Sequence, residues 1–355
     1  MEKLRLGIIG AGPIVEKKHL PALAEVPEIA VVAICRRNLE SLHQLADRFR
    51  IVKRYTDYRD LLDQKDIDAV LIATGPEAQP QIVMDAAAAR KHIFAEKPMA
   101  QTSVQARQMA DAIKAADVFF QLGFNKRFYY GYRQAKRLIQ SGELGALSGI
   151  HARFWFQAGR RSAMLHNGIH FFDLVHFFIG PVREVFARRY TLLPPDQRVV
   201  TSETVSVSLR GETGVVGNLL LSSLASWDYP NEHVDIIGSN YNVLSVANGR
   251  QLSLFRRGED QPAQLYENTL SVHWWSGNEE QGFASQLRVF AQNIRHRTDP
   301  LTGPDDLRLL SALADDGIRA LMLLDVVNTS IVENCNVPVP PLYQTLTDGV
   351  EEVVR

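Results

Sequence analysis

Two stretches of this 355-residue sequence combine side chains that can carry charge and move protons. The first is Glu96–Pro98, where a lysine follows the apolar run Ile93–Ala95 and a proline fixes the direction of the chain after it. The second is His166–Asp173, a histidine-rich helix start. Histidine changes charge near neutral pH, which suits general acid–base work. We expect Lys97 and His170 to face each other across a cleft.

The helix start allows other interpretations. His170 and Asp173 are three residues apart and share one helical face, so Asp173 could orient the imidazole. A lone histidine beside Phe171 and Phe172 is otherwise more often a satisfied core residue. The i, i+4, i+7 spacing of His166, His170 and Asp173 would also suit a metal ion.

A glycine turn stands near the start of the sequence. The apolar strand Leu4–Ile9 leads into Gly10-Ala11-Gly12-Pro13-Ile14-Val15, and an expected helix carrying His19 follows. In this context the first glycine permits the tight turn, the second lets the backbone approach a pyrophosphate, and the helix N-terminus attracts it. Val15 replaces the third glycine, so a purely structural turn is an equal alternative on these residues alone.

The second strand, Ile29–Ile34, ends in Cys35-Arg36-Arg37-Asn38. An NAD site usually has an acidic residue here for the ribose hydroxyls, whereas an arginine pairs with the 2′-phosphate of NADP. Arg36 and Arg37 therefore favour NADP over NAD. The alternative is a solvated basic loop before the helix Leu39–Phe49.

Strands and helices alternate through the first third of the sequence, which predicts a doubly wound parallel sheet. Expected strands are 68–74, 93–95 and 118–122, and expected helices are 82–89 and 103–116. Ligands bind at the carboxyl ends of such strands. The residues at those ends are Gly10, Gly12, Arg36, Thr74, Lys97 and Asn125.

Length, net charge and cysteine content limit the class of protein. The chain exceeds one ordinary core, so we expect two domains, 1–124 and 125–355. Its net charge of −1 favours neither nucleic acid nor membrane surfaces as partners. Two distant cysteines and the lack of a long apolar run or leader pattern predict a cytoplasmic protein.

In the expected second domain, apolar and polar residues alternate along runs that are separated by turns. Expected strands are 147–157, 182–193, 204–209, 215–222, 233–237, 242–246 and 252–256. We expect a mostly antiparallel sheet with helices on one face and a second subunit on the other, giving a homo-oligomer. Helices 279–296 and 306–331 close the chain, with Asp305 as a helix cap, and they are expected to pack back on the first domain.

Four segments in this order, Leu6–Ala22, Ala73–Thr74, Glu96–Pro98 and Gly168–Asp173, resemble the Gfo/Idh/MocA oxidoreductases, among them glucose–fructose oxidoreductase and inositol dehydrogenase. The resemblance implies a Rossmann domain followed by an α/β domain with a large, open-faced, mostly antiparallel sheet. It also implies a bound nicotinamide cofactor, here NADP with NAD as the alternative, and a carbohydrate substrate.

The resemblance also implies residue roles. His170 takes the proton of a secondary hydroxyl as hydride leaves for the nicotinamide, and Lys97 stabilises the same oxygen. Many relatives have aspartate where this sequence has His166, so His166 could instead be the base and His170 its orienter. Expected cofactor residues are Gly10, Gly12, Pro13, Ile14, Arg36, Arg37, Thr74, Gln79, Glu96, Lys97 and Asn125. Expected substrate residues are Lys97, Arg127, Tyr129, His166, Asn167 and His170.

The leading hypothesis is an NADP-preferring dehydrogenase or reductase of a sugar, polyol or nucleotide sugar. Arg127, Arg160 and Arg161 mildly favour an anionic substrate. One alternative is a cofactor-binding regulatory or scaffold protein without dehydrogenase activity, against which the presence of both Lys97 and His170 argues. Another is redox-neutral glycoside cleavage through a transient ketone.

Overall fold

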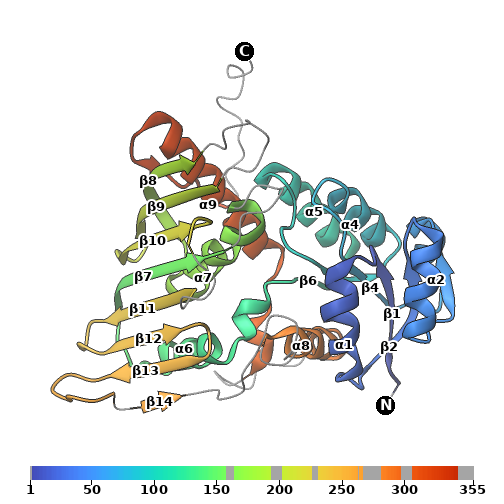
Figure 1. Ribbon diagram of the computed structural model, residues 1–355, viewed down its shortest axis with the longest axis horizontal. Coiled ribbons are helices and arrows are strands. Elements are labelled where there is room, and N and C mark those ends of the chain that lie inside the picture. The colour runs from blue at the N-terminus through green and yellow to red at the C-terminus, as the bar shows by residue number, and fades with distance from the viewer. Residues whose placement is uncertain are drawn as a thin grey trace.

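The computed structural model describes residues 2–156, 164–192, 202–225, 231–262, 264–266, 281–296 and 306–342. Two sheets, each with its own helices, lie side by side (Figure 1). This confirms the predicted class of a parallel Rossmann-type sheet followed by a large, mostly antiparallel one. Arg160, Arg161 and Asp305 lie outside the described residues.

The first sheet is parallel throughout and has the order β3-β2-β1-β4-β5-β6. Its order reverses between β1 and β4, which is where such sheets bind dinucleotides. The strands are β1 (Leu4–Ile9), β2 (Ile29–Cys35), β3 (Lys53–Tyr55), β4 (Ala69–Ile72), β5 (His92–Ala95) and β6 (Phe120–Leu122).

Helices connect these strands on both faces. They are η1 (Val15–His19), α1 (Leu20–Ala24), α2 (Leu39–Arg48), α3 (Tyr58–Leu62), α4 (Gln79–Ala88) and α5 (Ser103–Ala116). The short β3 and α3 were not predicted, because β3 has three half-buried residues and no apolar run.

The glycine turn depends on Gly10. Its φ is +90°, and a Cβ built there would lie 2.6 Å from the carbonyl oxygen of Ala73 at the end of β4. A Cβ at Gly12 would meet nothing within 4 Å. Gly10 is thus required by the protein's own backbone, whereas Gly12 leaves open space at the switch point.

The second sheet has nine strands in the order β14-β13-β12-β11-β7-β10-β9-β8-β15. Only β7 and β10 pair in parallel, because the chain leaves and returns to the sheet between them. The strands are β7 (Leu147–Trp155), β8 (Val182–Leu192), β9 (Ser202–Gly211), β10 (Val216–Ser222), β11 (Glu232–Gly238), β12 (Val243–Ala247), β13 (Gln251–Phe255), β14 (Gln264–Tyr266) and β15 (Val337–Pro338).

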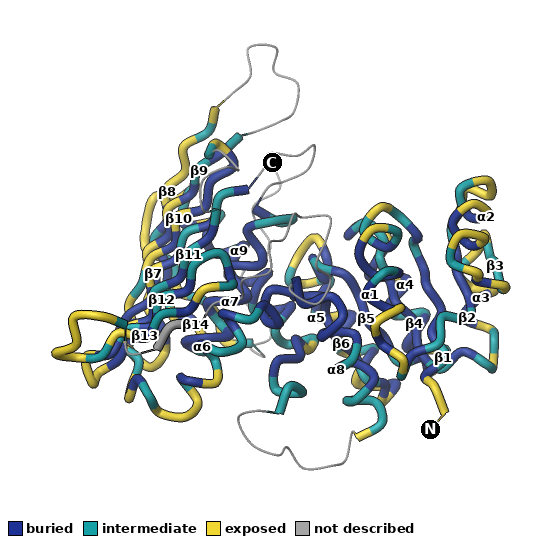
Figure 2. Tube along the Cα trace, turned by 60° about the horizontal axis from the view of Figure 1, so that its bottom comes forward, coloured by how far each residue is buried: buried dark blue, intermediate teal, exposed yellow. Residues whose placement is uncertain are grey.

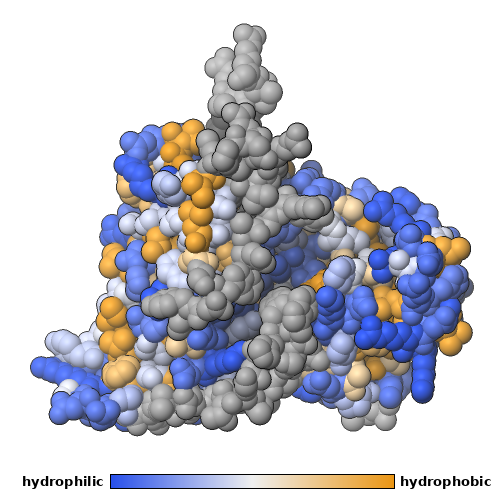
Figure 3. All heavy atoms as spheres, viewed as in Figure 1, coloured by the Kyte–Doolittle hydropathy of each residue, from blue (hydrophilic) through white to orange (hydrophobic). Residues whose placement is uncertain are grey.

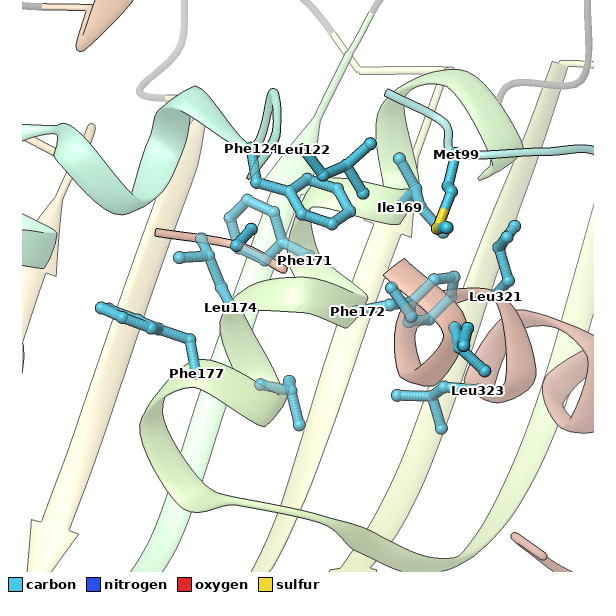
Figure 4. Close-up of a cluster of buried hydrophobic side chains, with 14 of the residues drawn as sticks. Met99, Leu122, Phe124, Ile169, Phe171, Phe172, Leu174, Phe177, Leu321 and Leu323 are labelled. Carbon is cyan, nitrogen blue, oxygen red and sulfur yellow. The ribbon is translucent and has the colours of Figure 1, made fainter. Parts of the chain in front are cut away.

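Helices cover the inner face of this sheet. They are η2 (Asn125–Phe128), α6 (Tyr130–Gln140), η3 (Met164–Gly168), α7 (Ile169–Ile179), η4 (Leu307–Leu310) and α9 (Ala314–Glu333). Figure 4 shows Ile169 of α7 beside Met99, from the segment after β5. A Cβ at Gly317 of α9 would lie 2.7 Å from the Met99 sulfur. The first domain, α7 and α9 therefore share one apolar core.

The last helix begins later than predicted. Residues from 306 read as helix in the sequence, but Leu307–Leu310 form a 3₁₀ turn and α9 starts at Ala314. The Asp316 carboxylate accepts the backbone N–H of Leu313 at 2.8 Å, and this cap fixes the start. The prediction of one continuous α-helix from residue 306 is wrong, because the chain is extended at Leu313, where this cap forms.

The outer face of the second sheet is exposed (Figure 2). On β9 buried and exposed residues alternate, so one face meets the helices and the other meets solvent. Val216 and Ile237 are 58% and 42% exposed on that outer face. Hydrophobic residues are scattered among hydrophilic ones over these strands (Figure 3). A second subunit on this face stays a prediction.

Helix α8 (Phe283–Arg295) packs against the first sheet, although it follows most of the second sheet in the chain (Figure 1). Phe290 packs edge-on against Phe94 of β5 at 5.8 Å, in one hydrophobic cluster with β1 and β2. The predicted start at residue 279 lies outside the described residues. The described helix begins after Gly282, whose φ is +71°.

We predict that Gly10→Ala lowers the free energy of unfolding by roughly 3 kcal/mol, because it adds both a strained φ and a clash with backbone. Gly12→Ala is the matched control and should change it by less than about 1 kcal/mol, since its Cβ enters open space. Urea unfolding of the two variants measures both values. Equal stability of the two variants would contradict this account of the turn.

Candidate active site

Lys97 lies at the end of β5 and reaches across to the second domain. Its Nζ donates to the backbone carbonyl of His166 in η3 at 2.7 Å. Burial lowers the pKa of Lys97; the Glu96 carboxylate opposes this shift, and the Lys126 ammonium adds to it. The lysine is therefore a half-buried charge at the junction of the two domains.

His170 stands one helical turn after His166, in the first turn of α7, and is 8% exposed. Its Nδ1 is buried and has no hydrogen-bond partner among the described residues. Burial, Lys97 and Lys126 all lower the pKa of His170 well below its usual value. The imidazole is thus neutral at physiological pH and able to accept a proton. Lys97 thus bonds the turn before His170, and its charge acts on the imidazole; their catalytic pairing stays a prediction.

Gln79, expected among the cofactor residues, contacts the lysine loop. Its Nε2 donates to the carbonyls of Glu96, Pro98 and Met99 at 2.6, 2.9 and 3.2 Å. The side chain is 1% exposed and comes from the first turn of α4. Gln79 therefore fixes the backbone on both sides of Lys97.

Glu96 joins the lysine loop to the helix after the glycine turn. His19 Nε2 lies 2.6 Å from Glu96 Oε1, and the Lys97 N–H donates to Glu96 Oε2 at 3.1 Å. His19, which the sequence analysis did not select, is fully buried. In the sequence His19 stands between the charged residues Glu16–Lys18 and the apolar residues Leu20–Ala24, which gives it no distinct signal.

Arg127 and Asp173 are paired with each other. The guanidinium donates to both carboxylate oxygens, at 2.9 and 2.5 Å, and also pairs with Asp316 of α9 at 3.0 Å. Burial alone would lower the pKa of Arg127, yet Asp173 and Asp316 raise it above its usual value. The pair ties η2, α7 and α9 together, and Asp173 makes no described bond to His170.

A second buried lysine lies beside this site. Lys126 forms an ion pair with Glu232 at the start of β11, and its ammonium lies 4.6 Å from the centre of the Phe154 ring. Tyr129, expected to contact substrate, is the second ring near this ammonium, at 4.9 Å. Sequence reasoning gave Lys126 no role, because its partner Glu232 is more than a hundred residues away.

The carboxyl ends of the first sheet's strands carry groups that make no described bond. Thr74 Oγ1 is buried without a partner in the described part of the chain. Arg36 is half-buried and Arg37 exposed at the end of β2, and neither side chain bonds to a described residue. With the open space at Gly12, this arrangement fits a dinucleotide. Asn125 is used differently, since its Nδ2 donates to the carbonyl of Gln281 at 3.0 Å.

The remaining candidates are placed as follows. Pro13 and Ile14 begin the helix after the glycine turn, and Asn167 is half-buried in η3 beside His166. Within the described ranges no group of three His, Cys, Asp or Glu side chains could hold a metal ion. The same ranges contain no helix with the length and apolar character to span a membrane.

The fold and this site define a two-domain dinucleotide-binding oxidoreductase. Residues 4–124 match the model of the oxidoreductase family with an NAD-binding Rossmann fold, and residues 132–243 match the GFO/IDH/MocA C-terminal domain. The chain belongs to the Gfo/Idh/MocA family, as its motifs indicated.

Named relatives support this family assignment. Inositol 2-dehydrogenase of Salmonella typhimurium is 31% identical over 350 residues, covering 93% of this chain and 97% of the relative. Myo-inositol 2-dehydrogenase of Thermotoga maritima is 24% identical over 313 residues, covering 85% and 92%. The structure of a levoglucosan dehydrogenase in complex with NADH and levoglucosan matches with a TM-score of 0.82 at 21% identity, covering 96% of this chain and all of that one.

We predict that Asp173→Asn lowers the free energy of unfolding by about 3–5 kcal/mol, because it leaves the buried Arg127 charge without its bidentate partner. The double variant Arg127→Met, Asp173→Leu should recover part of that loss, since the buried guanidinium is gone and only the Asp316 carboxylate, 23% exposed, loses its partner. Chemical denaturation measures both. If Asp173→Asn is as stable as the wild type but inactive, the carboxylate acts in catalysis instead.

Proposed function

We propose that this protein oxidises a secondary hydroxyl of a cyclic polyol or sugar, or reduces the matching ketone, with a nicotinamide cofactor. The observation that carries the proposal is the hydrogen bond from Lys97 Nζ to the His166 carbonyl, in the turn before His170. The Nδ1 of His170 is buried and has no partner in the described structure. The names of the inositol and levoglucosan dehydrogenases among its relatives support this substrate class.

The two side chains have complementary roles. His170 is neutral and accepts the hydroxyl proton. Lys97 spends one N–H on the His166 carbonyl and keeps two for the substrate oxygen, whose developing negative charge it stabilises. When bound, the nicotinamide supplies the hydride acceptor for the carbon that carries this oxygen.

We assign positioning roles to three of the other candidates. His166 holds Lys97 through its backbone carbonyl, which any residue provides, so aspartate is not needed there for this contact. Asp173 and Arg127 are occupied with each other and fix the start of α7, on which His170 lies. His170 rather than His166 is then the base.

The cofactor residues proposed are Gly12 and Thr74 for the dinucleotide backbone and Arg36 and Arg37 for a 2′-phosphate. The two arginines are unpaired among the described residues at the end of β2, where no acidic residue competes. NADP is therefore proposed as the preferred cofactor within this NAD-binding family.

Lys97→Ala is expected to lower turnover of the best wild-type polyol or sugar by about 100-fold or more, because the developing oxyanion loses its cationic donor. Cofactor affinity, measured by fluorescence titration, should change little. Removal of the positive charge also raises the pKa of His170, so the acid limb of the residual kcat/KM profile should move to higher pH. Wild-type turnover in this variant would refute the catalytic pair.

Arg36→Asp should weaken NADPH binding by roughly tenfold to a hundredfold and leave NADH binding equal or tighter, because the carboxylate repels a 2′-phosphate and accepts ribose hydroxyls. Arg257→Asp makes the same charge change on an exposed residue of the second domain and serves as control. Unchanged NADPH affinity in Arg36→Asp would exclude this arginine from the cofactor site.

A further inference from the structure

The Glu96 carboxylate is bound on two sides. Its Oε1 lies 2.6 Å from His19 Nε2, and its Oε2 accepts the main-chain N–H of Lys97 at 3.1 Å. The two side chains are 0% and 10% exposed. A short, buried hydrogen bond to a carboxylate is among the stronger polar contacts in a protein, so it transmits displacements well.

His19 belongs to the helix that begins at the glycine turn. The helix runs without a break from Pro13 and carries His19 at the end of its wide π turn, η1. The His19 ring packs edge-on against Phe94 at 5.7 Å and Phe283 at 5.4 Å. It has no freedom to rotate away from Glu96 without opening this aromatic contact.

The tautomer of His19 follows from the hydrogen bonds of its two ring nitrogens. Its Nδ1 is buried and finds no partner among the described residues. A neutral imidazole with its proton on Nε2 donates to Glu96 and leaves no buried N–H unsatisfied. The Glu96 carboxylate held in this way opposes the effect of burial on the pKa of Lys97.

The rest of this region is held from other elements. Lys18 Nζ donates to Gln281 Oε1 at 2.6 Å, just before α8, and Gln79 of α4 fixes the loop carbonyls. The hydrogen bond between His19 and Glu96 is a direct polar link from the helix of the glycine turn to the lysine loop.

We propose that His19 is a positioning residue that couples occupancy of the dinucleotide site to the placement of Lys97, through the Glu96 carboxylate. A dinucleotide phosphate at the helix N-terminus restrains that helix, and the restraint reaches the Lys97 backbone through two hydrogen bonds. The inference rests on the proposed function, because it treats Lys97 as the group that must be in place when the cofactor is.

The coupling can be measured without turnover, by hydrogen–deuterium exchange of the segment 92–101 with and without saturating NADPH or NADH. In the wild type the cofactor should slow exchange of this segment. His19→Gln retains a donor to Glu96 and should keep the effect. His19→Leu removes the donor and should reduce the cofactor-induced slowing by about fivefold or more, while cofactor affinity changes by less than about threefold.

Two variants guard against a merely structural effect. His176→Leu replaces a half-buried histidine, on α7, and should leave the exchange of 92–101 as in the wild type. Glu96→Gln is nearly isosteric but has only one acceptor oxygen for two donors, so it should lose part of the slowing. In turnover assays His19→Leu should lower kcat about tenfold with little change in the KM for cofactor, and His19→Gln should restore it.

Equal cofactor-induced slowing in the wild type and in His19→Leu would overturn the coupling. So would an equal loss in His176→Leu, because the effect would then reflect general loosening. The proposed function fails separately, when the wild type shows the slowing but turns over no polyol or sugar. Absence of cofactor-induced slowing in the wild type overturns the coupling whatever the turnover.

Discussion

The half-buried ammonium of Lys97 sets the main physical constraint on this molecule. Its pKa is lowered by burial, so the charge stays in place only because acceptors surround it: the His166 carbonyl at 2.7 Å and the Glu96 carboxylate nearby. Gln79 then spends its amide on three carbonyls of the same loop. Two elements of the first domain, β5 and α4, and one of the second, η3, thus meet at the loop that carries Lys97.

The charged side chains around the site differ in whether they have a carboxylate partner. Arg127 and Lys126 are buried and neutralised by Asp173 and Glu232, so each serves to fix its own helix or strand. Lys97 has only a backbone partner for its Nζ, and His170 has an unpartnered Nδ1 in the described structure. Lys97 and His170 are the two groups that the proposed function assigns to the substrate.

Local patterns made the first domain predictable from sequence, because its strands are continuous apolar runs and its turn residues mark their ends. The same patterns also predicted Lys97 and His170 as a catalytic pair, which stays a prediction. What sequence could not supply were partners brought together by long-range folding. Arg127 and Asp173 looked like substrate and acid–base groups, yet they satisfy each other. His19 gave no signal, since its partner Glu96 lies 77 residues away.

Helix α8 has a consequence for the order in which the protein is made. Phe283 and Phe290 complete the hydrophobic cluster that contains β1 and β2, but they follow the second domain's main sheet in the chain. A growing chain has therefore finished β6 long before it supplies them. At about 5–20 residues per second, the first domain waits roughly 10 to 30 s on the ribosome with part of its core exposed. During this interval the uncovered apolar surface is open to aggregation.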